Sequence, residues 1–146
     1  MMALRVGKDL FDYVDEIKVQ KSRQAMKRRL QEYAPNKGSV YKMERVAEKY
    51  YLIIFSAEWC SDCISHVPGL AKSLMMAKNN MLTARVVDYD NYRDMADEFN
   101  IKAIPTVIVF DKTWKEVGRF VETPRKYGSV EEEIWAIIDS KGTMKA

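Results

Sequence analysis

Cys60 and Cys63 are the residues of this chain whose type and spacing are best suited to chemistry. They are its only two cysteines, and they lie where a short apolar run ends and a helical pattern begins. Free backbone N–H groups and the helix dipole at a helix N-terminus stabilise a thiolate, which makes Cys60 the candidate nucleophile. Cys63 lies one turn further on, close enough to close a small disulfide ring. The pair therefore predicts thiol–disulfide exchange.

The same spacing is also compatible with a metal site or with a pair of inert thiols in the core. His66 follows Cys63 by three residues, so Cys60, Cys63 and His66 have the spacing of metal ligands. A structural zinc site normally has four ligands, and the chain has no third cysteine and no second histidine. We therefore expect no metal, and we place His66 on the exposed side of its helix. We expect no other cofactor, because the chain has no Gly-x-Gly-x-x-Gly sequence for a nucleotide.

The elements around the cysteines form a strand–helix–strand pattern. Residues 50–56 are a continuous apolar run rich in aromatic and β-branched residues, typical of a strand that is buried on both faces. After Cys63 the apolar residues recur at helical spacing until Asn79, and residues 81–88 are a second strand-like run. This order predicts a parallel pair of strands with a right-handed crossover.

The sequence after this unit predicts a hairpin and two further helices. Residues 92–99 fit a short helix. Residues 103–110 place a proline at the head of a β-branched run, residues 111–115 are typical of a turn, and residues 116–122 fit the return strand. Ser129 and Glu132 form an imperfect capping box for a last helix, which would pack on the sheet.

The first 49 residues show mainly helical patterns. Two apolar stripes, out of phase near residues 19–22, predict two helices or one bent helix that ends at residues 34–38. Ser39 is the expected cap of a further helix through Lys49, with Met43, Val46 and Ala47 facing inward. We interpret residues 1–49 as a helical N-terminal extension packed on or beside a domain of residues 50–146, in one globular unit overall. The extension would cover the edge of the sheet or bind a partner.

The motifs of the second segment resemble those of the thioredoxin family. They are Ala57-Glu58-Trp59-Cys60-x-x-Cys63, then Pro68 inside the helix, and Ile104-Pro105-Thr106 before an apolar strand. The resemblance implies an α/β, thioredoxin-like fold with a central mixed sheet flanked by helices. It implies that Pro68 kinks its helix and that the proline before the strand is cis and faces the disulfide. Trp59, Ile104 and Pro105 would then hold the backbone of a substrate.

The chain departs from the family's pattern at two places. Most thioredoxins have Gly-Pro between the cysteines, where this chain has Ser61-Asp62. Thioredoxins also carry a buried aspartate six residues before the first cysteine, where this chain has Ile54. Asp62 is therefore a candidate tuning residue. It would repel the thiolate, accept the proton of Cys63, or act only as a favourable residue in the first helical turn.

Composition and charge limit the location and the partners. No apolar run reaches the ~18 residues of a membrane span, and the first residues lack the apolar core of a signal peptide. A pair of cysteines at redox spacing agrees with a reducing compartment, so we expect a cytoplasmic protein.

Residues 1–49 hold 12 Lys and Arg against 7 Asp and Glu, and most of the excess lies in residues 18–29. We interpret that cluster as a solvated helix face, with a docking surface for an acidic partner or nucleic acid as the alternative. Binding of nucleic acid is not expected, because no aromatic residue interrupts the cluster.

These observations together predict a thiol–disulfide oxidoreductase that reduces protein disulfides through Cys60 and Cys63. An external reductase or a small dithiol would supply the electrons. The alternative is a binding or adaptor module that uses the thioredoxin fold for docking, with the disulfide as a redox switch and without turnover.

Overall fold

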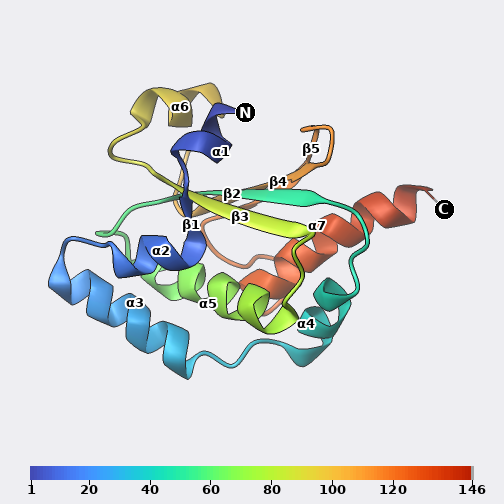
Figure 1. Cartoon of the computed structure of the whole chain (residues 1–146), viewed down its shortest axis with the longest axis horizontal. Helices are drawn as coiled ribbons and strands as arrows, with labels where there is room; N and C mark the ends of the chain where they lie inside the picture. Colours follow the sequence, from blue (N-terminus) through green and yellow to red (C-terminus); the bar gives the residue numbers. More distant parts are fainter. Residues whose placement is uncertain (146) are drawn as a thin grey trace.

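A five-stranded mixed sheet is the centre of the structure, a computed structural model that describes residues 1–145, and the side chains of residues 1–141 (Figure 1). The strand order is β1-β3-β2-β4-β5. β2 and β3 are parallel, and the other three pairs are antiparallel. The strands are β1 (Lys8–Asp9), β2 (Tyr50–Ser56), β3 (Leu82–Asp88), β4 (Thr106–Asp111) and β5 (Glu116–Val121).

Helices cover both faces of the sheet, as Figure 1 shows. The short helices α1 (Met2–Val6) and α6 (Arg93–Glu98) lie on one face. The other face carries α2 (Leu10–Asp15), α3 (Gln20–Glu32), α4 (Lys37–Glu44), α5 (Ser61–Ala77) and α7 (Val130–Lys145). The predicted α/β class and central mixed sheet are therefore confirmed. No helix among residues 1–145 is both long and apolar enough to cross a bilayer.

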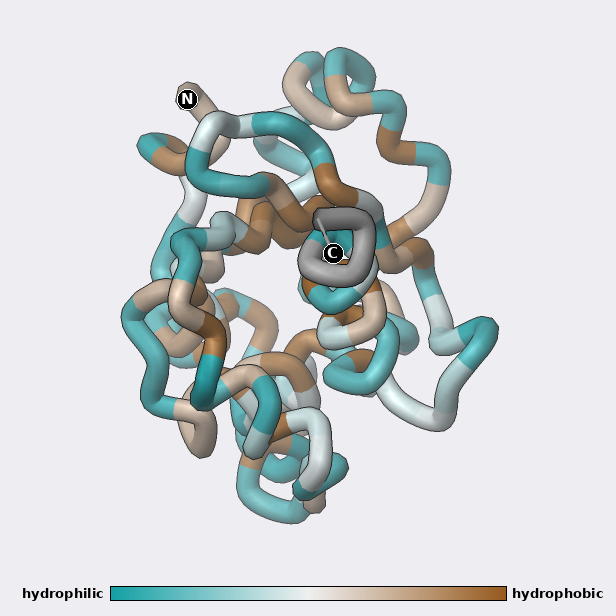
Figure 2. The backbone as a smooth tube through the Cα atoms, turned by 90° about the vertical axis from the view of Figure 1, so that its right-hand side faces the viewer, coloured by the Kyte–Doolittle hydropathy of each residue, from teal (hydrophilic) through white to brown (hydrophobic). Residues whose placement is uncertain are grey.

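β2 is buried on both faces because its side chains alternate between two apolar clusters. Leu52 and Ile54 belong to the larger cluster, on the side of α5, whereas Ile53 and Phe55 belong to the smaller one under α1 and α6. Figure 2 shows hydrophobic segments toward the middle of the chain trace and hydrophilic ones at its outer turns. The continuous apolar run of the sequence thus describes a central strand, as expected.

The first 49 residues contribute directly to the larger cluster. Leu10, Val14, Met26 and Met43 are at most 1% exposed within it. α3 packs against α5, and α4 packs against α5 and α7. α2 and α3 are two separate helices, one of the two arrangements that the out-of-phase stripes predict.

Glu131, at the start of α7, ties the N-terminal segment to the C-terminal helix. Its side chain is 1% exposed and accepts hydrogen bonds from the Tyr33 hydroxyl at 2.6 Å and from the Asn36 amide at 2.7 Å. The Tyr33 ring in turn lies against α5, where a Cβ at Gly69 would come within 2.9 Å of it. Glycine at this position therefore allows the segment to approach α5 closely.

The fourth helix differs from its prediction. Asn36, not Ser39, is the cap: its side-chain oxygen accepts from the Ser39 amide at 2.8 Å, and Ser39 lies buried inside the helix. The helix ends at Glu44 instead of Lys49, so Ala47 is exposed. The prediction was wrong because two capping residues occur three positions apart, and only packing decides between them.

Several other elements match their predictions within a residue or two, with two additions. Ser129 caps α7, its hydroxyl accepting from the Glu132 amide and donating to the Glu132 carboxylate. Pro68 lies inside α5, and the Ile104–Pro105 bond is cis. The additions are α1 and β1, which no sequence pattern predicted. β1 pairs with Val86 and Arg85 of β3 and covers part of that edge of the sheet.

We predict that Asp111→Ala lowers the free energy of unfolding by about 2–4 kcal/mol at pH 7. The buried carboxylate accepts from the Thr113 hydroxyl and the Lys115 amide and pairs with Lys141 at 3.3 Å. The Thr113 hydrogen bond, together with the Lys115 amide and Lys141, holds the pKa of Asp111 well below its usual range. A carboxyl whose pKa is lower in the folded than in the unfolded state stabilises the fold at pH values above its unfolded pKa. The difference in free energy of unfolding between parent and variant should therefore shrink as the pH falls below about 4. Urea unfolding at pH 7, 4 and 3 measures this, and a difference that does not change with pH would contradict it.

Candidate redox site

Cys60 lies between the end of β2 and the start of α5, as its N-cap residue. Its sulfur accepts a hydrogen bond from the Cys63 amide at 3.2 Å. Its thiol also lies 3.5 Å from the Ile104 carbonyl oxygen, to which it donates. Because an amide of the first helical turn points at the sulfur, negative charge on Cys60 is stabilised. The side chain keeps 7% of its surface exposed, so a substrate sulfur has a path to it.

Cys63 lies one turn deeper and is fully buried. Burial, reinforced by the neighbouring Cys60, raises the pKa of the Cys63 thiol. Hydrogen bonds from the Ser56 side chain and the Ala57 backbone act in the opposite direction. Both cysteines are free thiols, so the structure shows the reduced pair. Cys60 is the more accessible of the two cysteines, at 7% exposed against 0% for Cys63, which is the order that the sequence predicts.

A cleft of about 450 Å³ opens over Cys60. Trp59, which is 62% exposed, and Ile104 are among its lining residues, and the Trp59 indole donates to Asp90 at 2.7 Å. Two of the three predicted substrate-binding residues therefore border the cleft. Pro105 is buried and does not line this cleft; it lines a small cavity with His66 and Phe120.

Tyr89, Lys102 and Glu122 are among the cleft residues that the sequence patterns did not assign to the site. Tyr89 directly follows β3, and its amide donates to the Ser56 carbonyl at the end of β2. Glu122 follows β5 in a left-handed backbone conformation, and its amide donates to the Pro105 carbonyl at 2.7 Å. A positive φ at a glutamate has no sequence signal, which is why Glu122 could not be found.

Asp62 is half-exposed in the first turn of α5, and its charge acts on His66, four residues later. The sequence analysis placed His66 on the exposed side of the helix, and this prediction was wrong. It is half-buried, and its ring meets that of Phe120 edge-on at 5.9 Å. Burial lowers the pKa of His66 against the opposing charge of Asp62. Within the described residues, no three metal-ligating side chains are grouped to hold an ion.

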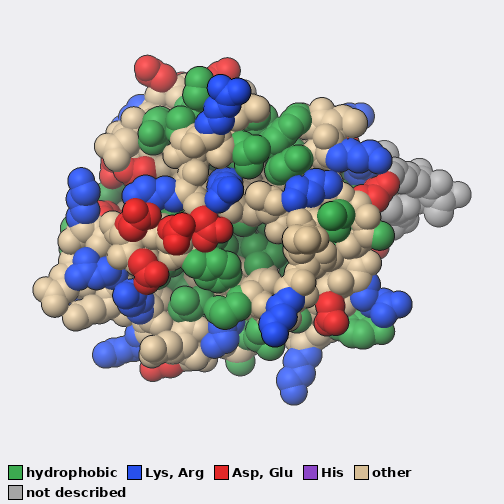
Figure 3. All heavy atoms as spheres, viewed as in Figure 1, with side chains coloured by type: hydrophobic (Ala, Val, Ile, Leu, Met, Phe, Trp, Pro, Cys, Tyr) green, Lys and Arg blue, Asp and Glu red, His purple; other side chains and the backbone are tan. Residues whose placement is uncertain are grey.

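The basic residues of α3 are partly used within the molecule. Lys27 pairs with Asp15 at 3.2 Å, and the Arg29 guanidinium donates to the Ser65 carbonyl of α5 at 3.0 Å. Arg29 also lines a groove between α3 and α5, together with Lys21 and Arg28. Figure 3 shows Lys and Arg side chains along the lower edge of the molecule, where these helices lie.

This geometry has counterparts in known proteins. A family model described as thioredoxin matches residues 7–134, and so includes most of the N-terminal helices. The chain belongs to the thioredoxin family. Family members carry out thiol–disulfide chemistry, and this chain has its two cysteines at the start of α5, beside an exposed Trp59.

Individual relatives within the thioredoxin family match only parts of their length. Mouse protein disulfide-isomerase A5 is 31% identical over 88 residues, which are 60% of this chain and 16% of that protein. Thioredoxin from Echinococcus granulosus is 34% identical over 74 residues, which are 51% of this chain and 66% of that protein. The chain thus spans a small part of the isomerase and just under two thirds of that thioredoxin.

Solved structures support the fold alone. A Pseudomonas aeruginosa protein of unknown function is 19% identical, with a TM-score of 0.81 over 95% of this chain and 96% of its own. Thioredoxin-2 of a malaria parasite has a TM-score of 0.53 at 20% identity, over 66% of this chain. Because the first match extends over nearly the whole chain, the shared fold includes N-terminal helices. The second covers a smaller share of this chain but 86% of its own.

Proposed function

We propose that this protein reduces protein disulfides through a dithiol–disulfide cycle of Cys60 and Cys63. The Cys60 thiolate attacks a substrate disulfide, forms a mixed disulfide and releases one substrate sulfur as a thiolate. Cys63 then loses its proton and attacks the Cys60 sulfur, so the second substrate sulfur leaves as a thiolate. Each leaving thiolate takes up a proton. The substrate gains two electrons, and the cysteine pair becomes a disulfide.

The arrangement of one accessible and one buried sulfur at the same helix start supports this proposal most strongly. The Cys60 sulfur lies at the floor of the cleft beside Trp59 and accepts the Cys63 amide, whereas Cys63 lies behind it without exposed surface. A substrate disulfide in the cleft therefore meets Cys60 first. Cys63 can act only afterwards, on the mixed disulfide.

The electrons for each new cycle must come from another molecule. We propose an external reductase or a small dithiol as the donor, because the oxidised pair has no further cysteine in the chain to reduce it. Protein disulfides are the proposed substrates, since the cleft is open and bordered by an exposed indole as well as by charged side chains.

Reduction of insulin with dithiothreitol as the donor tests the proposal. We expect the protein at micromolar concentration to accelerate insulin precipitation, and oxidation to remove two free thiols per chain. Loss of two thiols without acceleration of insulin reduction would contradict reductase activity. It would support the binding module with a redox switch instead.

A further inference from the structure

The surroundings of Cys63 pose a chemical problem for the second step of this cycle. Cys63 must become a thiolate to attack the mixed disulfide, yet it is fully buried, and burial disfavours the charged form. Ile54, where thioredoxins have a buried acid, is apolar and 0% exposed. The two buried carboxylates of the described residues are engaged elsewhere, Asp111 with Thr113 and Lys141, and Glu131 with Tyr33 and Asn36.

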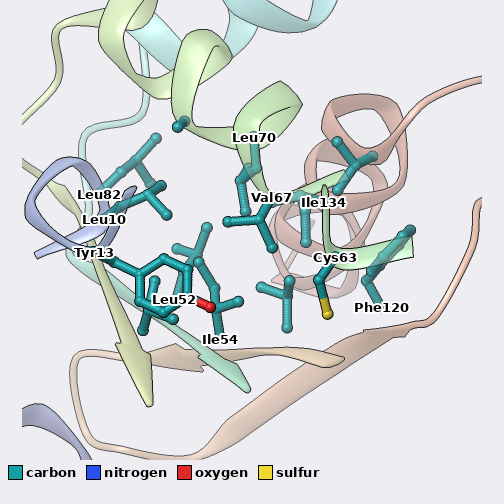
Figure 4. Close-up of a cluster of buried hydrophobic side chains, with 14 of the residues drawn as sticks. Leu10, Tyr13, Leu52, Ile54, Cys63, Val67, Leu70, Leu82, Phe120 and Ile134 are labelled. Carbon is teal, nitrogen blue, oxygen red and sulfur yellow. The ribbon is translucent and has the colours of Figure 1, made fainter. Parts of the chain in front are cut away.

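A buried pair of hydroxyl groups occupies this position of the core instead. Ser56 lies on the same face of β2 as Ile54, which shares an apolar cluster with Cys63 and Tyr13. Burial raises the pKa of the Cys63 thiol, and hydrogen bonding with the Ser56 side chain acts against that increase. The Tyr13 hydroxyl donates to the Ser56 oxygen at 3.3 Å. Ser56 is 0% exposed and Tyr13 is 7% exposed, so both residues are buried. Figure 4 shows Tyr13 reaching from α2 into the buried cluster, with its hydroxyl directed toward the side where Ile54 lies.

The secondary structure explains why these two hydroxyl groups meet. Side chains of a strand alternate between its faces, so Ser56 points to the same face as Ile54, toward α5 and Cys63. Tyr13 lies on α2, and the side chain of its N-cap residue Asp9 accepts a hydrogen bond from the Phe11 backbone amide at 2.9 Å. Asp9 is also the second residue of β1, so pairing of β1 with β3 fixes where α2 begins.

The protonation state of Tyr13 sets the direction of its hydrogen bond with Ser56. Burial raises the pKa of the Tyr13 phenol, which therefore keeps its proton throughout the working pH range. A protonated phenol donates to Ser56, and the Ser56 hydroxyl is then free to donate to sulfur. Each donor polarises the next, so the pair can stabilise an anion at the end of the chain.

We propose that the Ser56 hydroxyl, supported by Tyr13, donates to the Cys63 sulfur and stabilises its thiolate while that thiolate attacks the mixed disulfide. This role rests on the proposed function. In the step, the bond between Cys60 and the substrate sulfur breaks and the bond between Cys60 and Cys63 forms. The cysteine pair is oxidised, the substrate sulfur is reduced, and the proton lost by Cys63 reaches the leaving thiolate through solvent. Ser56 is thus a catalytic residue, and Tyr13 is a positioning residue that acts through it.

The other titratable groups around this chain of hydroxyls act less directly. Cys60 is the neighbouring thiol of Cys63 in the reduced protein, and its sulfur is uncharged in the mixed disulfide. Asp88 and Glu58 act on Tyr13 from the end of β3 and from the loop before Cys60. Tyr13, Glu58 and Asp88 line a second cleft together with Glu16 and Asp90. Figure 3 shows acidic side chains gathered at this end of the molecule, over α2 and the ends of β2 and β3. Burial and the negative charges of Asp88 and Glu58 oppose ionisation of Tyr13, which keeps the phenol a donor. Lys8 and Lys18 line the same cleft.

The expected effect follows from the balance of acidity and nucleophilicity. Loss of a hydrogen bond to a charged group reduces the thiolate fraction about 10- to 100-fold. A thiolate of higher pKa is also the stronger nucleophile, which restores about half of this loss on a logarithmic scale. We therefore expect Ser56→Ala to slow ring closure about 3- to 10-fold at neutral pH. Tyr13→Phe should slow it less, by about twofold.

Stopped-flow reaction of the full reduced chain with one equivalent of 5,5′-dithiobis(2-nitrobenzoate) separates the two steps. Cys60 releases the first thionitrobenzoate when it attacks the reagent, and Cys63 releases the second when it closes the ring. We expect Ser56→Ala and Tyr13→Phe to slow the second release and to leave the first unchanged. The defect should diminish as the pH rises, because thiolate formation then needs less help.

Tyr33→Phe is the matched control, since it removes a hydroxyl group from the same segment, bonded to Glu131 and not to Ser56. Equal rates of ring closure in the parent, Ser56→Ala and Tyr13→Phe would overturn the proposal, and so would an equal slowing by Tyr33→Phe. Absence of a second release in the parent would overturn the proposal and the dithiol cycle together. Slower ring closure in the two variants of a protein that fails to reduce insulin would support the role of Ser56 and Tyr13 and contradict only the reductase activity.

Discussion

Cys63→Ser will accumulate covalent mixed disulfides with protein substrates, whereas Cys60→Ser will form none. The first variant keeps the accessible thiol, stabilised by the amide at position 63, but lacks the sulfur that releases the substrate. The second keeps only a buried thiol, which no substrate disulfide can reach. Turnover of insulin should fall to the uncatalysed rate in both, a loss on the order of a thousandfold or more for removal of a covalent nucleophile.

Non-reducing electrophoresis of each variant after incubation with oxidised insulin, followed by mass spectrometry, measures the trapped species. Ser61→Ala is the control, because Ser61 lies between the cysteines and lines the cleft without taking part in the exchange. Mixed disulfides on Cys63 in the Cys60→Ser variant would mean that the assignment of nucleophile and resolving thiol is reversed.

Residues 50–146 on their own will not form a stable domain. Each of Leu10, Val14, Met26 and Met43 is buried against elements of that segment, and burial of such a side chain contributes about 1.5–3 kcal/mol. Their combined loss, with the loss of Ile17 and Val40 from the same cluster, equals the whole stability of an ordinary domain, about 5–15 kcal/mol. Deletion would also uncover the faces of α5 that α3 and α4 now cover.

Thermal unfolding followed by circular dichroism, with the amide dispersion of a proton–nitrogen NMR spectrum, compares this fragment with the full chain. We expect a broad transition and poorly dispersed signals from the fragment, and recovery of a cooperative transition when a peptide of residues 1–49 is added. A cooperative transition of the fragment alone would show that the N-terminal helices are an accessory layer.

The part of the fold that the sequence predicted well is governed by local patterns. Neighbouring residues alone were enough to predict the apolar strand β2, the helix start at the two cysteines and the helix after them. This is because strand burial and helix periodicity show over a few residues. β1 escaped prediction because two residues, Lys8 and Asp9, are too few to show any period. Its position comes from pairing with a strand more than 70 residues later in the chain, which no local pattern contains.

The candidate site divides in the same way. Cys60, Cys63 and Trp59 form one motif, and Ile104 and Pro105 another, so both could be found by their spacing. The contact between Tyr13 and Ser56 joins positions 43 residues apart, and neither residue is unusual in its own segment. His66 was misplaced because a lone histidine, with no second ligand for a metal, was expected on the surface, whereas its ring packs edge-on against Phe120 of β5.

The hydrogen bonds of Glu131 affect the order in which the molecule can assemble on the ribosome. Tyr33 and Asn36 leave the ribosome early, but the carboxylate that fixes both lies almost 100 residues later. Tyr33 and Asn36 therefore lack this partner until residue 131 has been made, although α3 can pack on α5 before then. Contacts of such long sequence separation slow folding and lengthen the exposure of apolar surface. During synthesis, residues 1–49 therefore expose apolar side chains such as Leu10 and Met26 before the elements that bury them have been made.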